Sequence, residues 1–134
     1  MRYLLDANIL SDLIRNPHGE VAAQIREVGA DEVCTSIVAA SELRYGAVRK
    51  QSGRLSQKVD ELFRTIPVLP LDEPADAVYG EMRVKLERKG RPIGANDMFI
   101  AAHALALGYT LVTDNEREFR QVPGLRIENW LRRP

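Results

Sequence analysis

The sequence has little cysteine, no net charge and no long apolar run. Cys34 is the only cysteine among the 134 residues, so neither a disulfide framework nor a cysteine-based metal site can be built. No His or Asn lies near Cys34 in the sequence. We therefore expect a buried structural thiol there and not a nucleophile.

Membrane and export signals are also missing. No apolar stretch approaches the ~18 residues that cross a bilayer, and the N-terminus has no basic region followed by an apolar segment and a small-residue cleavage site. We expect a cytoplasmic protein that does not associate with membranes. A hydrophobic fraction of 45% is ordinary for a globular core, and one domain usually takes ~100–200 residues, which predicts a single domain over residues 1–134.

The charge is balanced overall but not evenly spread. With 19 basic and 19 acidic residues, non-specific adhesion to polyanions is not expected, although a local basic patch remains possible. The basic residues gather in two stretches, which are either solvated helix faces or patches that bind phosphates. These stretches contain Arg44, Arg49, Lys50, Arg54 and Lys58, and then Arg83, Lys85, Arg88, Lys89 and Arg91.

The first fifteen residues carry the most informative pattern. An apolar run, Tyr3–Leu5, ends on Asp6, and helical spacing of apolar residues follows at Ile9, Leu10, Leu13 and Ile14. This predicts a buried strand, a carboxylate at its carboxyl end and a helix. Ligands bind at the carboxyl ends of strands in open parallel sheets. Asp6 therefore either meets a substrate or a metal, or merely caps the helix that follows.

Strands and helices alternate along the rest of the chain. The periodicity predicts helices over Glu20–Val28, Ile37–Lys50, Arg54–Thr65, Pro74–Lys89 and Met98–Leu107, the last capped by Asn96. It predicts strands over Glu32–Ser36, Tyr109–Thr113 and Leu125–Ile127, and an edge strand or extended link over Ile66–Leu71. Such alternation implies an α/β fold in three layers, with a mainly parallel central sheet and right-handed crossovers.

Acidic residues stand at the places where this fold predicts a cleft. Glu42 lies near the apolar side of its helix, where a carboxylate is costly to bury unless it is paired, hydrogen-bonded or metal-bound, although a surface glutamate is the alternative. The helix that Asn96 is expected to cap is apolar nearly throughout Met98–Leu107, which predicts that it is buried. Asp97 lies in its first turn, where the helix dipole favours the ionised form. Asp114 ends the Tyr109–Thr113 strand at the same sheet edge as Asp6, and Glu118 lies one helical turn further on.

Carboxylates gathered in one cleft repel each other. At ~4 Å apart, each pair costs about 4 kcal/mol at an effective dielectric of about 20. A hard divalent cation resolves this, and all-oxygen ligands without Cys point to Mg²⁺ or Mn²⁺ and not to Zn²⁺. We expect His103 to be a satisfied core histidine. Such an ion activates water and offsets phosphoryl charge, and the basic residues nearby would hold the flanking phosphates of a polyanion.

Five segments carry a family resemblance, in order along nearly the whole chain. The segments LLDANIL, SELRYGA, RPIGANDMFIAAHAL, LVTDNEREF and PGLRIENW together resemble the PIN-domain ribonuclease toxins of bacterial toxin–antitoxin pairs, the VapC family. The resemblance implies a PIN-like α/β/α fold and Mg²⁺-dependent RNA cleavage. It implies that Asp6, Glu42 and Asp97 match the family's acidic triad, with Asp6 and Asp97 as metal ligands. Relatives often carry Asn where Asp114 stands, which leaves Asp114 or Glu118 as the fourth acid.

The resemblance also implies partners. Relatives of this kind cut tRNA, dimerise, sometimes as two dimers, and are silenced by a small VapB-like antitoxin that inserts a helix and a peptide into the acidic groove. The groove between the first helix and Arg54–Thr65 suits an amphipathic segment. We expect Thr113 and Asn115 to hydrogen-bond the ligating acids. The candidate RNA contacts are Arg44, Arg49, Lys50 and Arg91.

Two other functions are considered. Asp6 could be the nucleophile of a phosphoryl transfer through an aspartyl phosphate, but Asn8 stands where such enzymes usually place a second acid. The acids could also serve a non-catalytic module, for metal-linked stability or for docking a basic peptide. Metal titration combined with an RNA-cleavage assay separates these functions.

Overall fold

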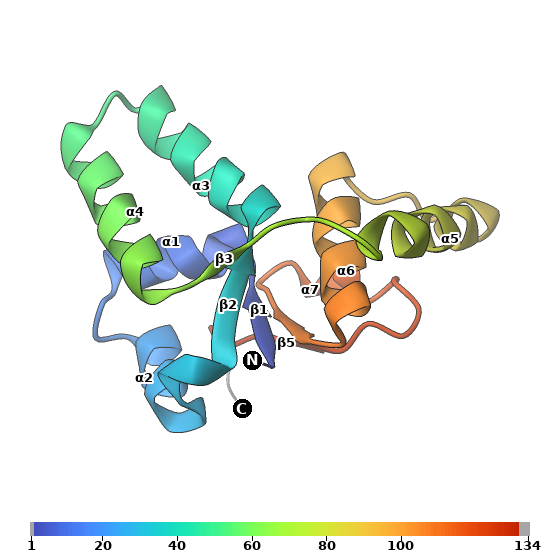
Figure 1. The fold of residues 1–134 in the computed structure, drawn as a ribbon, viewed down its shortest axis with the longest axis horizontal. Coiled ribbons are helices and arrows are strands. Elements are labelled where there is room, and N and C mark those ends of the chain that lie inside the picture. Colours follow the sequence, from blue (N-terminus) through green and yellow to red (C-terminus); the bar gives the residue numbers. More distant parts are fainter. Residues whose placement is uncertain (1, 132–134) are drawn as a thin grey trace.

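The computed structural model describes residues 2–131, which form a five-stranded sheet flanked by helices (Figure 1). The strands are β1 (Tyr3–Leu5), β2 (Val33–Ser36), β3 (Val68–Leu69), β4 (Thr110–Val112) and β5 (Ile127–Glu128). Their order in the sheet is β3-β2-β1-β4-β5, and every pair of neighbours is parallel. The strand order reverses beside β1, because the chain leaves β3 and returns on the other side of β1 as β4.

The helices occupy both faces of the sheet. They are α1 (Ala7–Arg15), α2 (Glu20–Val28), α3 (Ile37–Arg49), α4 (Gly53–Thr65), α5 (Ala75–Arg88), α6 (Ala95–Leu107) and α7 (Glu116–Phe119), with a short 3₁₀ turn η1 (Ala30–Glu32). In Figure 1 the first four helices lie on one side of the strands and the last three on the other. Right-handed crossovers account for this, because the chain moves across the sheet in opposite directions before and after β3. The predicted three-layer α/β fold is confirmed.

One local prediction differs from the structure, and another is confirmed. Asn96 was expected to cap the helix that contains Asp97, but α6 begins at Ala95 with Gly94 as its N-cap. The Asn96 side chain instead hydrogen-bonds Glu42 of α3, and Asp97 stays in the first turn. The predicted short edge strand within Ile66–Leu71 is present as β3. It is limited to two residues because the flanking prolines, Pro67 and Pro70, have no N–H to donate to a ladder.

The core lies on both faces of the central strands. Leu4, Leu5, Leu111 and Val112 are fully buried, as expected for parallel strands covered by helices on both sides. The small residues of α6 are buried with them, namely Ala101, Ala102 and Ala104. Trp130 is buried near the end of the described chain, with its ring centroid 5.2 Å from that of Tyr3.

The two polar side chains that we expect in the core, His103 and Cys34, are buried and have hydrogen-bond partners. His103 is buried, with Nδ1 2.9 Å from Ser36 Oγ, which confirms its structural role. The thiol of Cys34 is fully buried and donates to the Tyr3 carbonyl at 3.4 Å. Burial raises the pKa of Cys34 to about 11, so the thiolate that a nucleophile needs is suppressed. In the described part of the chain, no helix combines the length and the apolar character that a membrane span requires.

Candidate active site

Asp6 lies at the point where the strand order reverses, directly after β1. Crevices at such reversal points are where open α/β sheets bind ligands. Asp6 is 5% exposed. Its Oδ1 accepts the Ala7 N–H at 2.8 Å, and its Oδ2 accepts the Thr113 hydroxyl at 2.7 Å. Burial raises the pKa of Asp6 in spite of these two hydrogen bonds. Asp6 therefore caps α1, as one interpretation of the sequence predicts; its role as a ligand of a substrate or metal stays a prediction.

Asp97 and Glu118 meet across the ends of α6 and α7. The side-chain amide of Asn115 donates to Asp97 Oδ2 at 3.2 Å and to Glu118 Oε2 at 2.8 Å. The other oxygen of Glu118 accepts the backbone N–H of Gly94. One asparagine and one backbone amide therefore join the N-terminal end of α6 to α7 and fix both carboxyl groups.

The pKa values of these two carboxyl groups are shifted in opposite directions. Burial, together with the nearby Glu118, raises the pKa of Asp97 to about 7, and the charges of Asp6 and Glu42 add to this. Partial burial by itself would also raise the pKa of Glu118. However, hydrogen bonds from Gly94, Asn115 and the Asp97 carboxyl hold the pKa of Glu118 below its ordinary value. Of the two carboxyl groups, Asp97 is therefore the one that binds a proton more readily.

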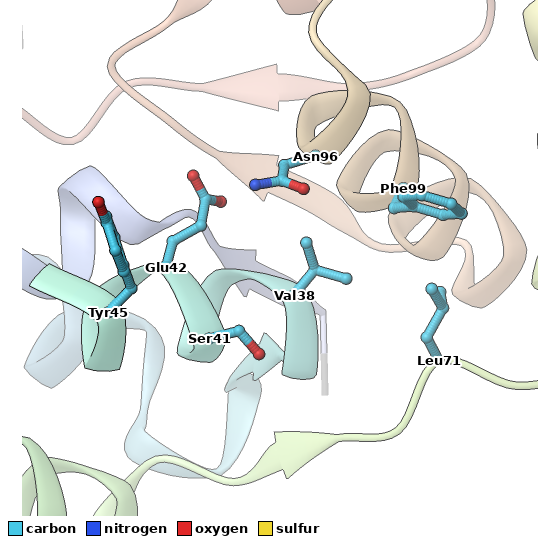
Figure 2. A pocket seen from close by; sticks show the side chains of 7 residues that line it. All are labelled: Val38, Ser41, Glu42, Tyr45, Leu71, Asn96 and Phe99. Carbon is cyan, nitrogen blue, oxygen red and sulfur yellow. The ribbon is translucent and has the colours of Figure 1, made fainter.

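Glu42 projects from α3 toward the same cleft (Figure 2). Its Oε1 is buried and has no hydrogen-bond partner. Burial and the charge of Asp6 raise the pKa of Glu42, against a hydrogen bond with Asn96 that lowers it. A buried carboxylate oxygen without a donor is costly, so this atom points to a ligand that the protein alone does not supply.

The structure thus brings Asp6, Glu42, Asp97 and Glu118 together. Asp114 faces another direction: its Oδ1 accepts the side-chain amide of Asn129 at 2.9 Å, and that amide also reaches Glu116 Oε2 at 3.1 Å. Of the two residues predicted as the fourth acid, Glu118 is the one that shares the Asn115 amide donor with Asp97. Asp114 lies instead against the segment that follows β5.

The predicted supporting residues make the expected contacts. The Thr113 hydroxyl donates to Asp6, and its oxygen accepts the Asn115 N–H at 3.0 Å. This links the end of β4 to the end of β1 and then to the Asp97–Glu118 pair through the Asn115 amide. Gly94, which the sequence did not single out, completes this network.

The predicted RNA-contacting residues differ in their surroundings. Arg44 is paired with Asp60 at 2.8 Å and lies 5.2 Å from the centroid of the Phe63 ring, while Arg49 and Arg91 are exposed. Lys50 lines a pocket of about 290 Å³ between α1, α3 and α4 that also contains Glu42 and Arg15. Arg15 was not predicted. Its spacing of four from Ser11, whose hydroxyl accepts from its guanidinium at 2.7 Å, marks the polar face of α1.

The donor set fits a hard divalent cation. Within residues 2–131, no group of three or more His, Cys, Asp or Glu side chains is arranged to hold a metal ion. Mg²⁺ commonly takes only one or two carboxylates and completes its shell with water. Two features leave room for such an ion. Glu42 Oε1 has no partner, and a Cβ at Gly94 would lie 3.6 Å from Glu118 Oε1 and 3.9 Å from Asp97 Oδ2. The glycine keeps that space open.

Without Mg²⁺, the free energy of unfolding is expected to fall as the pH rises from about 4 to about 7. Asp97 has a pKa of about 7 in place of 3.8, so over this range the folded state binds more protons than the unfolded state, which makes the slope negative. Because Asp97 is only half-buried, its ionisation costs about 1–2 kcal/mol after screening, or roughly 5 °C in Tm. Thermal unfolding with EDTA at pH 5 and 7.5 measures this. Between these two pH values, Asp97→Asn should lose less free energy of unfolding than the parent protein. An equal loss in both proteins would contradict the assignment of the raised pKa to Asp97.

Comparison with known proteins shows the family to which the chain belongs. The PIN domain profile matches residues 3–125, and the chain therefore belongs to the PIN-domain family. A tRNA(fMet)-specific endonuclease VapC of Shigella flexneri is 38% identical over 131 residues, which cover 97% of this chain and 98% of that protein. Within the family, the chain is a ribonuclease of the VapC type.

Solved structures give the same result. A VapBC2 complex from Rickettsia felis, bound to a DNA fragment from its promoter, contains a chain that superimposes with a TM-score of 0.87 at 35% identity, covering 97% of this chain and 99% of that one. VapBC-1 from nontypeable Haemophilus influenzae gives a TM-score of 0.85 at 31% identity, covering 98% of this chain and 100% of that one. The predicted PIN-like fold is confirmed.

Proposed function

We propose that this chain is the Mg²⁺-dependent endoribonuclease toxin of a type II toxin–antitoxin pair, that it cleaves tRNA, and that a cognate VapB-like antitoxin inhibits it. The observation that supports the proposal is that Asp6, Glu42, Asp97 and Glu118 lie near enough for their charges to shift one another's pKa, close to the point where the strand order reverses. The described part of the chain offers no cation in hydrogen-bond contact with them that would offset their charge.

Each acid has a distinct task in this proposal. Asp6 and Asp97 would hold the ion, which would supply charge stabilisation at the phosphodiester and a more acidic bound water. Glu42, whose pKa is raised by burial and by Asp6, takes a proton from that water or binds a second ion. Glu118 holds Asp97 in place through Asn115, and the Thr113 hydroxyl orients Asp6. Mn²⁺ suits the same oxygen donors as Mg²⁺.

The choice of tRNA rests on the relatives. The Shigella flexneri protein that matches nearly the full length of this chain is named as a tRNA(fMet)-specific endonuclease. In this chain Arg15 and Lys50, in the pocket next to Glu42, are placed to hold phosphates on one side of the acids. Arg49 and Arg91 are exposed and add a wider basic rim, whereas Arg44 is already paired with Asp60.

The antitoxin is proposed to cover the pocket between α1, α3 and α4. Structural neighbours come from VapBC complexes, and this pocket combines apolar residues such as Ile14 and Leu55 with the acid Glu42. An amphipathic segment with a basic residue at its end matches that lining. Such a segment would occupy the phosphate-binding side of the site, which explains inhibition by direct competition. We propose that the toxin forms a homodimer and that antitoxin binding builds larger assemblies.

Removal of the metal is expected to abolish cleavage. Purified protein incubated with total tRNA and Mg²⁺ should give fragments with defined ends, and excess EDTA should stop their formation until Mg²⁺ is restored. Mapping both ends of the fragments identifies the cut. Cleavage that continues in EDTA after extensive dialysis would overturn the metal assignment. Mg²⁺ and RNA binding without any cleavage would favour a non-catalytic module.

A further inference from the structure

A second pocket, of about 420 Å³, lies beside the acids between α3 and α6 (Figure 2). Helix α3 contributes Glu42 and Tyr45, α6 contributes Asn96 and Phe99, and Leu71 closes the end after β3. Figure 2 shows the Glu42 carboxylate and the Asn96 amide near each other in the middle, with Tyr45 and Phe99 toward opposite ends. The volume falls within the range of sites that bind small molecules or single groups of a larger ligand.

The two aromatic rings of this pocket are unusually exposed. Tyr45 is 65% and Phe99 37% exposed. One side of the Phe99 ring stacks on Tyr79, with centroids 4.6 Å apart and planes at 14°, and Arg83 donates to the Tyr79 hydroxyl at 2.9 Å. Phe99 is therefore held in position before any ligand arrives, so little conformational entropy is lost when something stacks on it.

Glu42 separates this pocket from the one that holds Arg15 and Lys50, and the two differ in chemistry. The pocket at Phe99 has no Lys or Arg among its described lining residues, whereas the other has two cations. A nucleotide has the same division, because its phosphate is anionic while its base has an apolar face and a hydrogen-bonding edge. Cations suit the phosphates, and exposed rings suit the base. The Asn96 amide adds a donor and an acceptor for the base edge.

We propose that the pocket between α3 and α6 binds one unpaired nucleobase of the RNA, next to the phosphate that is cleaved, with the base stacked on Phe99 and bordered by Tyr45. This rests on the proposed function, since a substrate bound at the acids is what brings a base to Glu42. A base in a duplex cannot enter such a pocket, so the site selects single-stranded loops. The other possible occupant is a second copy of this chain, and the test below distinguishes the two.

Fluorescence titration tests the stacking without cleavage. On an Asp6→Asn background with Mg²⁺ present, short single-stranded RNAs with 2-aminopurine at each position in turn are titrated with protein. Quenching at one position, adjacent to the mapped cut, is expected. Phe99→Leu on the same background should remove that quenching and weaken binding about 10-fold, within the range given by one lost base–aromatic stack. Equal quenching with leucine at position 99 would overturn the proposal.

Matched variants separate stacking from loss of fold. Two control variants should bind RNA within about 2-fold of the parent protein. Phe99→Tyr keeps a ring at the same position, and Leu107→Ala removes an apolar side chain of similar exposure, 36%, from the same helix. In the active protein, Phe99→Leu should raise KM about 10-fold and change kcat less than 3-fold. An unchanged KM with normal RNA cleavage would contradict the proposed base pocket but not the proposed nuclease activity.

The oligomeric state provides the remaining outcome. Sedimentation of Phe99→Leu and Tyr45→Leu should give the same mass as the parent protein if a base fills the pocket. Dissociation into smaller species in both variants would show that a second copy covers it, and the proposal would fail. If the parent protein cleaves no RNA under any condition, the proposed function fails, while the 2-aminopurine titration still measures whether a base stacks on Phe99.

Discussion

Asp97→Asn is expected to lower the rate of Mg²⁺-dependent RNA cleavage at least about 1,000-fold. The substitution removes a negative charge and one of the two proposed ligands, and the loss of about 4 kcal/mol of transition-state stabilisation corresponds to that factor. The fold should survive, because asparagine has the same shape and its oxygen can still accept the Asn115 amide that now contacts Asp97 Oδ2. The measurement is single-turnover cleavage of the mapped tRNA at saturating Mg²⁺.

A matched control separates charge at this site from charge elsewhere. Asp76 also stands in the first turn of a helix, α5, and is exposed. Asp76→Asn makes the same chemical change and should retain activity within about 2-fold. Circular dichroism and thermal unfolding should show that both variants are folded. Near-normal turnover of Asp97→Asn with Mg²⁺ would contradict the proposed mechanism.

Asp6→Asn is expected to give a similar loss for a related reason. Asparagine caps helices about as well as aspartate, so the bond that Asp6 Oδ1 now accepts from Ala7 N can be kept by the amide oxygen. The charge that would bind the ion is lost while the helix cap remains. The new amide group replaces the oxygen that accepts the buried Thr113 hydroxyl, so a decrease in Tm is expected as well, and circular dichroism should show that the variant is still folded when its cleavage rate is measured.

The local pattern of the sequence is sufficient to predict the first of these acids. An apolar run followed at once by helical spacing places Asp6 at a strand end, and the structure has β1 over Tyr3–Leu5 with α1 starting at Ala7. The nearly continuous apolar run Met98–Leu107 likewise predicts the buried helix that carries Asp97 in its first turn. Both predictions depend on positions close in sequence, where burial on one face leaves few alternatives.

The rest of the site depends on how distant segments pack, which local periodicity does not describe. Asn96 turns to Glu42 on another helix instead of capping its own. Gly94 is recognisable as a loop residue, but its N–H meets Glu118, 24 positions away. The short strand β4 ends at Val112, and beyond it the alternation of side chains stops, so the direction of Asp114 could not be inferred from the strand.

Glu118→Gln is expected to reduce cleavage about 10- to 100-fold, whereas Asp114→Asn should stay within about 3-fold of the parent protein. Glu118 accepts from the Gly94 N–H and from the Asn115 amide that also holds Asp97. A glutamine amide in its place would meet the Asn115 amide donor to donor. Loss of a residue that orients a metal ligand usually costs this much in metal affinity or activity. Asp114 instead accepts from Asn129.

Mg²⁺ titration gives this comparison a second readout. If Glu118 acts by positioning Asp97, Glu118→Gln should raise the Mg²⁺ concentration for half-maximal cleavage 10-fold or more. Glu116→Gln is the matched control, since Glu116 lies on the same short helix and contacts Arg120 and Asn129; its Mg²⁺ requirement should be unchanged. A large loss in Asp114→Asn together with normal activity in Glu118→Gln would reverse the assignment of the fourth acid.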